Sequence, residues 1–176
     1  MTVGVELRDI VTEDDVQAVM GLRRGPGQER YLGMMISHFE DAIADAIACP
    51  RYWSVHDDTG LLVGFAMISD GIPQDVLDAH EDIVGPYYLW RLLIDHRVQG
   101  RGLGAATTDA VADYVRTRPG GDVLFTSCRP GDGSPQPFYV KHGFVKTGRI
   151  VDGEDLLRLD LRGARRDPQP AIGGRG

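Results

Sequence analysis

The amino-acid sequence predicts a single domain of mixed α/β fold. Its length of 176 residues suits one domain with a sizeable core. Segments with strand character alternate along the chain with segments whose apolar residues recur at helical spacing. The domain is organised around residues 87–115, which combine an apolar strand, a loop with three glycines and a helix. Residues 88–94 are almost continuously apolar, as expected of a strand covered on both faces.

A strand and two helices are expected before this stretch begins. Residues 3–11 alternate loosely between apolar and polar side chains and predict a first strand. Thr12 and Asp15 have the spacing of a capping box, so a helix should start directly after Thr12. A second helix is expected over residues 29–48, because its apolar residues recur at helical spacing and Pro50 follows its end.

A hairpin and an acidic loop should follow. Residues 52–56 and 61–69 predict two strands, because the turn signal Asp-Asp-Thr-Gly separates them. Residues 70–85 are polar and acidic, and they are expected to loop out with one helical turn.

The C-terminal part predicts a further strand, a short helix and a final hairpin. Residues 123–127 have strand character, and a short helix should begin at Pro135. Residues 144–150 and 156–161 predict the last two strands. The tail, residues 163–176, is rich in glycine and proline and poor in apolar residues, so it is expected to be mobile.

Composition narrows the class of protein. The hydrophobic content of 42% and the charged content of 26% are ordinary for a globular domain. The net charge of −7 argues against nucleic acid as a partner and is compatible with a cationic one. Charged residues near the N-terminus and the lack of long apolar runs predict no signal peptide and no membrane span, and favour a cytoplasmic location. Cys49 and Cys128 lack metal-site spacing, and reduced thiols are favoured over a disulfide.

The glycine loop, residues 99–104, indicates an anion site. A glycine-rich turn that opens a helix points several backbone N–H groups at one place, where the helix dipole is positive. The loop lacks the Gly-Lys-Ser/Thr of a Walker motif. Gly100, Gly102 and Ala105 fit a dinucleotide fingerprint, but the acidic residue expected after the next strand is missing and few residues remain for repeated βαβ units. A structural turn without a ligand is the remaining alternative.

Two motifs resemble those of the GNAT superfamily of N-acetyltransferases. Gln99, Gly102 and Gly104 match its pyrophosphate-loop pattern Gln/Arg-x-x-Gly-x-Gly/Ala, and residues 138–144 resemble its Phe-Tyr-x-x-x-Gly-Phe segment. The order of the predicted elements is similar as well. The resemblance implies a GNAT domain over residues 1–162, with a mostly antiparallel sheet of about seven strands and about four flanking helices. It also implies that the central strand splays from the next one at a bulge, which exposes backbone groups.

The resemblance also implies acetyl-CoA as co-substrate and no metal. The cofactor-binding residues would be Leu93, Ile94, Gln99, Gly100, Arg101, Gly102, Leu103, Gly104 and Ala105. The pantetheine arm would lie beside Leu93 and Ile94 like an extra strand. The N–H of Leu93 would polarise the thioester carbonyl.

Tyr139 would be the catalytic acid that protonates the departing thiolate. A phenol that titrates near 10 is a fair match for a thiol with a pKa of about 8.5. The general base is not identified by the resemblance, because the central strand lacks the glutamate that many relatives carry. Glu29, Glu81, Asp82 and water chains are the candidates.

The acceptor is expected to be a small primary amine, with polyamines favoured. Residues 89–95 and the loop are similar to bacterial spermine/spermidine-type acetyltransferases. Tyr88, Trp90 and Glu29 would line the acceptor pocket, with cation–π contact from the aromatic rings. The alternatives are an aminoglycoside or a protein amine as acceptor, a non-catalytic acyl-CoA-binding domain, or a nucleotide-binding module. A homodimer is one expected assembly, with neither nucleic acid nor membrane as partner.

Overall fold

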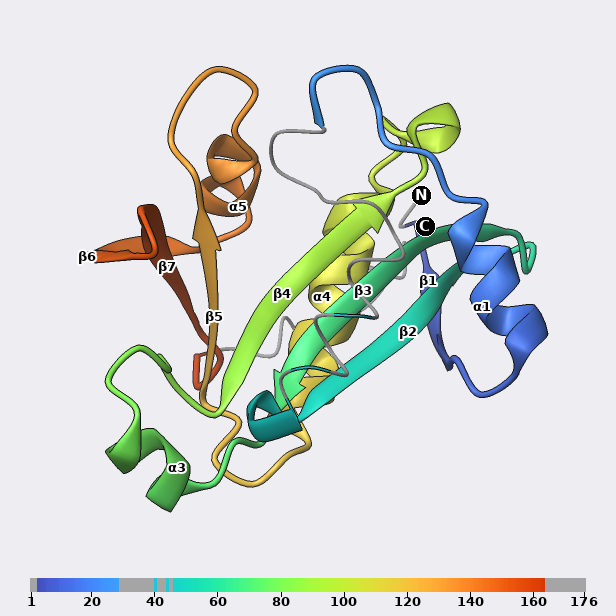
Figure 1. Ribbon diagram of the computed structural model, residues 1–176. Helices are drawn as coiled ribbons and strands as arrows, with labels where there is room; N and C mark the ends of the chain where they lie inside the picture. The colour runs from blue at the N-terminus through green and yellow to red at the C-terminus, as the bar shows by residue number, and fades with distance from the viewer. Residues whose placement is uncertain (1–2, 29–39, 41–43, 45, 164–176) are drawn as a thin grey trace, which may run out of the picture.

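The computed structural model describes residues 3–28, 40, 44 and 46–163. One seven-stranded sheet runs through the described part in the order β1-β2-β3-β4-β5-β7-β6. Its strands are β1 (Val5–Asp9), β2 (Pro50–Asp57), β3 (Leu62–Asp70), β4 (Tyr87–Ile94), β5 (Val123–Cys128), β6 (Val145–Val151) and β7 (Glu154–Asp160). The helices are α1 (Glu13–Met20), α3 (Gln74–Ala79), α4 (Leu103–Arg116) and α5 (Gln136–Lys141), with short 3-10 helices η2 (Ala46–Ala48) and η3 (His96–Val98). This arrangement confirms the predicted mixed α/β fold (Figure 1).

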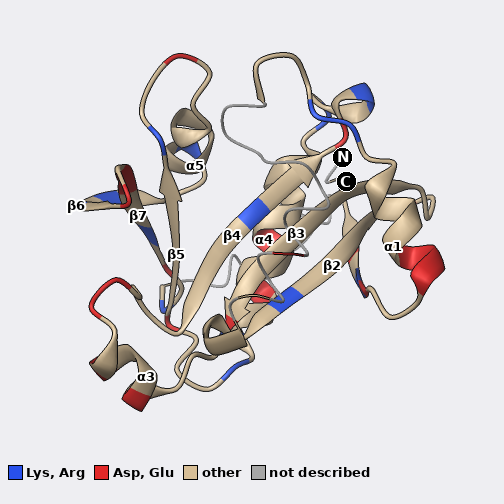
Figure 2. Ribbon diagram, viewed as in Figure 1, with Lys and Arg blue, Asp and Glu red and all other residues tan. Residues whose placement is uncertain are grey.

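The first helix starts where the capping box predicts. The hydroxyl of Thr12 accepts a hydrogen bond from the Asp15 N–H at 3.1 Å, and the Asp15 carboxylate accepts one from the Thr12 N–H at 2.9 Å. The first turn of α1 is acidic, which suits the positive end of its dipole (Figure 2). Most of the predicted helix 29–48 and the tail from residue 164 lie outside the described residues. The acidic segment 70–85 contains α3.

Strands β4 and β5 separate along their length, as predicted for the central splay. They are parallel neighbours, and their register consists of the pair Tyr88 and Phe125. The other neighbouring strands pair antiparallel over longer stretches. Figure 1 shows β4 and β5 diverging toward their carboxyl ends, so that a gap opens beside α5.

A β-bulge in β4 changes which side chains share a face. Ile68 of β3 is opposite Leu89, whereas Met67 is opposite Arg91, so Trp90 is the extra residue. The side-chain alternation therefore shifts by one position after the bulge. This shift decides which part of β4 faces each of the two hydrophobic clusters.

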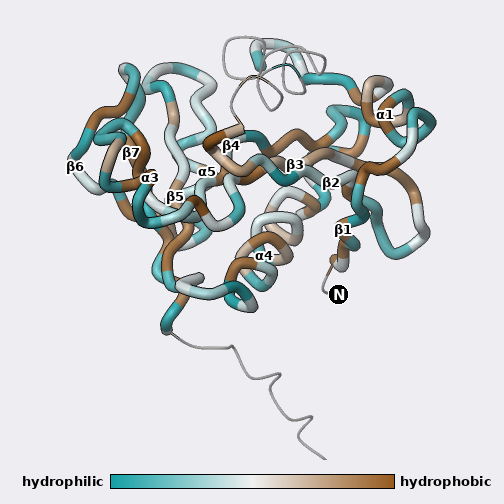
Figure 3. Tube along the Cα trace, turned by 60° about the horizontal axis from the view of Figure 1, so that its bottom comes forward, coloured by the Kyte–Doolittle hydropathy of each residue, from teal (hydrophilic) through white to brown (hydrophobic). Residues whose placement is uncertain are grey.

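Helices cover the sheet on both faces and create two clusters. In one, Leu89 and Ile94 of β4 pack with residues of α4 and α5. In the other, Leu93 packs with Phe65 of β3 and with Val19 of α1. Figure 3 shows the hydrophobic strands β3 and β4 lying between α4 and α1. We call these the α4 face and the α1 face of the sheet. Every helix in the described part of the chain is too short or too polar to cross a lipid bilayer.

Candidate active site

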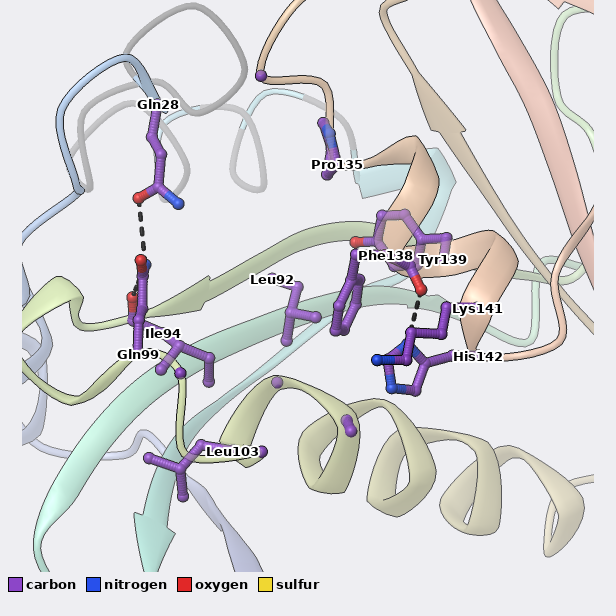
Figure 4. Close-up of a pocket in the computed structure, with 15 residues that line it drawn as sticks. Gln28, Leu92, Ile94, Gln99, Leu103, Pro135, Phe138, Tyr139, Lys141 and His142 are labelled. Carbon is purple, nitrogen blue, oxygen red and sulfur yellow. Dashed lines mark hydrogen bonds between the residues drawn. The ribbon is translucent and has the colours of Figure 1, made fainter.

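A cavity of about 570 Å³ lies between the end of β4, the start of α4 and the helix α5 (Figure 4). The residues that line it are Gln28, Leu92, Ile94, Gln99, Gly100, Gly102, Leu103, Gly104, Ala105, Gly133, Pro135, Phe138, Tyr139, Lys141 and His142. The glycine loop and the tyrosine helix are separated by about thirty residues in the sequence, and the fold brings both to one cavity. The sequence motifs therefore meet at one site.

The start of α4 presents free backbone donors to this cavity. Gly102 is the N-cap residue and adopts a left-handed conformation, with φ of 82°, which glycine tolerates. No side chain of the described residues caps the helix. The N–H groups of Leu103, Gly104 and Ala105 therefore lack helical partners at the positive end of the dipole. This geometry can bind an anion.

The absence of a side chain at Gly104 allows α5 to approach α4. A Cβ built at this position would lie 3.3 Å from two ring carbons of Phe138. That distance is tighter than ordinary van der Waals contact, so a larger residue would push Phe138 aside. The ring of Phe138 forms one wall of the cavity as a result.

The side chain of Gln99 makes hydrogen bonds with other residues of the protein. Its amide nitrogen donates to the carbonyl oxygen of Ile94 at 2.8 Å and to the side-chain oxygen of Gln28 at 3.2 Å (Figure 4). The same Gln28 oxygen accepts the N–H of Gly25 at 2.6 Å. Both amide hydrogens of Gln99 are therefore occupied, and its side chain orients the loop.

The backbone N–H groups of Leu92 and Ile94 in β4 point away from β3. The N–H of Asp95 donates to the carbonyl of Val63 in β3 at 2.8 Å. Because successive N–H groups of a strand point to opposite sides, the N–H of Leu93 also faces β3. The N–H groups of Leu92 and Ile94 face the gap toward β5. The side chain of Leu93, which is 2% exposed, lies in the cluster on the α1 face. The sequence-based role of Leu93 as carbonyl-polarising donor therefore fits Leu92 or Ile94 better.

Tyr139 lines the cavity from α5 and is deeply buried. It is 7% exposed, and its ring meets those of Phe138 and Phe144 edge-on at 5.1 and 5.2 Å. Burial raises the pKa of Tyr139, and the neighbouring Cys128 raises it further. The expected titration near 10 is therefore wrong for this environment. The phenol stays protonated and is a weaker acid than the sequence suggested.

Lys141 and His142 were not singled out from the sequence, and they line the cavity from α5. The ring of His142 packs 4.3 Å from that of Phe138, and its Nδ1 donates to the Phe138 carbonyl oxygen at 2.6 Å. Spacings of three and four residues from Phe138 place both on its side of the helix. That periodicity is the signal which could have found them.

The predicted acceptor residues that the structure describes lie outside this cavity. Tyr88 donates its hydroxyl to Ser127, and Trp90 packs against the α1-face cluster; neither is among the described residues that line the cavity. Arg101 is not among them either, and Glu29 lies outside the described residues. Of the suggested bases, Glu81 and Asp82 are exposed between α3 and β4, and neither lines the cavity.

Comparison with known proteins identifies the class. The sequence profile of the Acetyltransferase (GNAT) family matches residues 17–144. The chain belongs to the GNAT family of acetyltransferases, whose members use acetyl-CoA as acetyl donor. No curated protein sequence matches the chain.

Solved structures share the fold at low sequence identity. A GNAT acetyltransferase from Listeria monocytogenes is 16% identical, with a TM-score of 0.63 over 91% of this chain and 98% of that one. The PaiA N-acetyltransferase from Thermoplasma acidophilum, in complex with coenzyme A, is 14% identical, with a TM-score of 0.59 over 91% and 99%. The spermidine/spermine N-acetyltransferase SpeG from Vibrio cholerae is 16% identical, with a TM-score of 0.52 over 88% and 90%. At these identities the likeness concerns the fold.

Proposed function

We propose that the cavity binds acetyl-CoA and that the protein transfers the acetyl group to a primary amine of a small molecule. The observation that carries this proposal is the uncapped start of α4 beside the splayed strand β4. Free N–H groups at a helix start suit a pyrophosphate. A strand whose backbone faces a gap suits an extended arm that pairs with it.

The proposed cofactor position follows from these two features. The pyrophosphate is held by the N–H groups of Leu103, Gly104 and Ala105. The pantetheine arm runs along β4 and pairs with the backbone of Leu92 and Ile94. One of their N–H groups then polarises the thioester carbonyl, because an oxyanion develops on that oxygen during attack. Phe138 and the side chains of Leu92 and Ile94 exclude water from the arm.

The transfer step forms a C–N bond and breaks a C–S bond. The neutral amine attacks the thioester carbonyl carbon, and the coenzyme A thiolate leaves. Tyr139 donates its proton to this thiolate, which a buried and protonated phenol can do. The attacking nitrogen loses a proton as it becomes the amide nitrogen. A phenolate whose pKa is raised takes up a proton readily, so this proton restores the phenol for the next turnover.

A polyamine is the proposed acceptor class. The net charge of −7 favours cationic substrates in general. The resemblance of residues 89–95 to spermine/spermidine-type acetyltransferases points the same way. Aminoglycosides and peptide amines are cationic as well, so an acceptor panel has to separate the three.

Two measurements test the function. Calorimetry with acetyl-CoA and with NAD should show binding of acetyl-CoA alone. An assay of free thiol release should then show faster acetylation of spermidine or spermine than of aminoglycosides or lysine peptides. Turnover restricted to peptides or antibiotics would remove the polyamine proposal. Binding of NAD in place of acetyl-CoA would remove the whole function.

A further inference from the structure

Three side chains from three strands form a hydrogen-bonded chain beside the splay. The hydroxyl of Tyr88 in β4 donates to the hydroxyl of Ser127 in β5 at 2.6 Å. The hydroxyl of Ser127 donates in turn to the carboxylate of Glu154, the first residue of β7. The guanidinium of Arg129 lies 3.9 Å from the other oxygen of this carboxylate. The chain thus leads from a half-buried phenol to a carboxyl group that is partly exposed to water.

This chain lies on the α1 face of the sheet. Leu89 and Cys128 belong to the cluster on the α4 face, so their neighbours Tyr88 and Ser127 point to the opposite side. Asp155 bonds to Gln136 of α5, which places it on the α4 face and Glu154 on the other. The proposed acetyl donor occupies the α4 face. The hydroxyl chain therefore approaches the reaction centre from the side that the donor leaves open.

Tyr88 lies at the point along β4 where this strand begins to separate from β5. Tyr88 and Phe125 are the pair at which β4 and β5 still meet. Beyond them the strands diverge, and the proposed thioester enters that gap (Figure 1). The charge of Tyr88 acts on the pKa of Tyr139, the proposed proton donor to the thiolate, so the two phenols lie within electrostatic reach of each other.

We propose that Tyr88, Ser127 and Glu154 form the relay that removes the proton from the acceptor ammonium. The inference rests on the proposed function, for which no base is assigned. An alkylammonium ion titrates at about 10.4, so most of the acceptor is protonated at neutral pH and cannot attack. The relay supplies the missing step.

The proton moves in three concerted or successive hops. The ammonium gives a proton to the Tyr88 oxygen, Tyr88 gives its own proton to Ser127, and Ser127 gives its own to the Glu154 carboxylate. The products are a neutral amine and a neutral Glu154, with both hydroxyls restored. The side chain of Glu154 is 30% exposed, so it can release the proton to water.

The groups around the chain suit this direction of transfer. Burial raises the pKa of Tyr88 to about 12, which keeps its hydroxyl neutral and able both to accept and to donate. Arg91 and Cys128 are the other titratable groups that act on the pKa of Tyr88, Tyr88 in turn acts on the pKa of Tyr139, and Arg129 lies beside Glu154.

The decisive experiment compares two amines on a Glu154→Gln variant. The glutamine side chain keeps an oxygen for the Ser127 hydroxyl but takes no proton. With an alkylamine at pH 7, kcat/KM should fall by about 10²-fold. With an α-amino amide, which titrates near 8, the loss should be a few-fold, because a sizeable fraction is already neutral. The loss with the alkylamine should shrink as the pH rises toward 10. Affinity for acetyl-CoA by calorimetry should not change.

Two further variants test whether the loss is specific to the relay. Asp155→Asn removes a carboxylate from the next position of the same strand, on the opposite face, where it bonds Gln136 and Lys146. This variant should leave kcat/KM unchanged with both amines. Ser127→Ala interrupts the relay while keeping the carboxylate, and should reproduce the selective loss even if Glu154→Gln folds poorly.

Each outcome separates the relay from the proposed function. Equal losses on both amines, or no loss on either, would overturn the relay while acetyl transfer stands. Wild-type protein that binds acetyl-CoA but acetylates neither amine would overturn the transfer function, and the relay with it.

Discussion

The amide of Gln99 donates to the carbonyl of Ile94 at 2.8 Å, across the turn that joins β4 to α4. This bond fixes the end of the strand relative to the glycine loop. It also holds the Ile94 backbone turned away from β3, in agreement with the bond from Asp95 to Val63. The two proposed contacts with acetyl-CoA, one at the loop and one on the strand, are therefore held in register by one side chain.

Gln99→Ala should weaken acetyl-CoA binding without abolishing it. The variant loses the hydrogen bond to Ile94 that orients the loop and also the one to Gln28, so the dissociation constant should rise about tenfold, which corresponds to roughly 1.4 kcal/mol. Calorimetry measures the change. Gln17→Ala is the matched control, because it removes an exposed amide that donates to Glu13 on α1. An unchanged affinity in Gln99→Ala would show that the loop keeps its shape without the bond.

Gly102→Asp should abolish acetyl-CoA binding. The carboxylate would sit where the pyrophosphate is proposed to lie, and we expect at least about a 100-fold loss of affinity. Its left-handed backbone also makes any side chain strained, by about 1–2 kcal/mol. Gly60→Asp is the matched control, because Gly60 has φ of 83° in the β2–β3 turn. Both variants should lose similar stability in thermal unfolding, and only Gly102→Asp should lose binding. Normal affinity in that variant would refute the phosphate site.

The sequence predicted the loop, α4 and the tyrosine helix because their signals are local. Glycines at a helix start, helical spacing and a capping pair act within a few residues of one another. The resemblance implied a bulge in the central strand, but its position at Trp90 was not predicted, because that position depends on how β4 registers against β3. The direction of the hydrogen bonds between β3 and β4, which turns the Leu93 N–H toward β3, could not be predicted from the sequence either.

The sequence did not predict the contacts between segments that are distant along the chain. The side chain of Gln99 donates a hydrogen bond to Gln28, 71 positions earlier in the sequence. The hydroxyl of Ser127 accepts one from Tyr88, 39 positions earlier. Nothing in the spacing of these residues marks them as partners. The burial that raises the pKa of Tyr139 is likewise a property of the packed core around it.

Asp95→Asn should destabilise the protein by about 2 kcal/mol, the size expected for a charged hydrogen bond. The Asp95 side chain is buried and accepts the backbone N–H of Arg23 and the guanidinium of Arg97. Hydrogen bonding to Arg97 holds the pKa of Asp95 well below its usual range. The pKa of Asp95 is lower in the folded protein than its unfolded value of about 3.9. The ionised carboxylate therefore stabilises the fold above about pH 3.9, and this stability is lost as the pH falls toward the folded-state pKa.

Denaturant unfolding between pH 2 and pH 7 measures this contribution. The free energies of unfolding of the wild type and Asp95→Asn should differ by the whole amount at pH 7, and this difference should decrease below about pH 4. Asp113→Asn is the control, because Asp113 pairs with Arg116 at an exposed position and should change stability by less than about 0.5 kcal/mol. A pH-independent difference would mean that the loss comes from packing alone.

Tyr139→Phe should lower turnover while leaving acetyl-CoA affinity nearly unchanged. The variant keeps the ring and its edge-on contacts with Phe138 and Phe144 and removes the hydroxyl. General acid catalysis supplies about 10²–10⁴-fold, and we expect the low end, since a thiolate leaves readily without a donor. Single-turnover kinetics separates this chemical step from product release. Unchanged turnover under those conditions would return Tyr139 to a packing role.

The pH dependence of the same pair of proteins tests the environment of the phenol. The donor is the protonated phenol, so a raised pKa extends its working range upward, and the donor is lost only as the pH rises through that raised value. Between pH 6 and about pH 10.5, the wild-type and Tyr139→Phe profiles should run parallel, because an ordinary phenol titrates near 10 and this one does not. Both should rise with pH as the amine loses its proton. A falling limb with a midpoint near 10, seen in the wild type and missing in the variant, would show that Tyr139 titrates as an exposed tyrosine does.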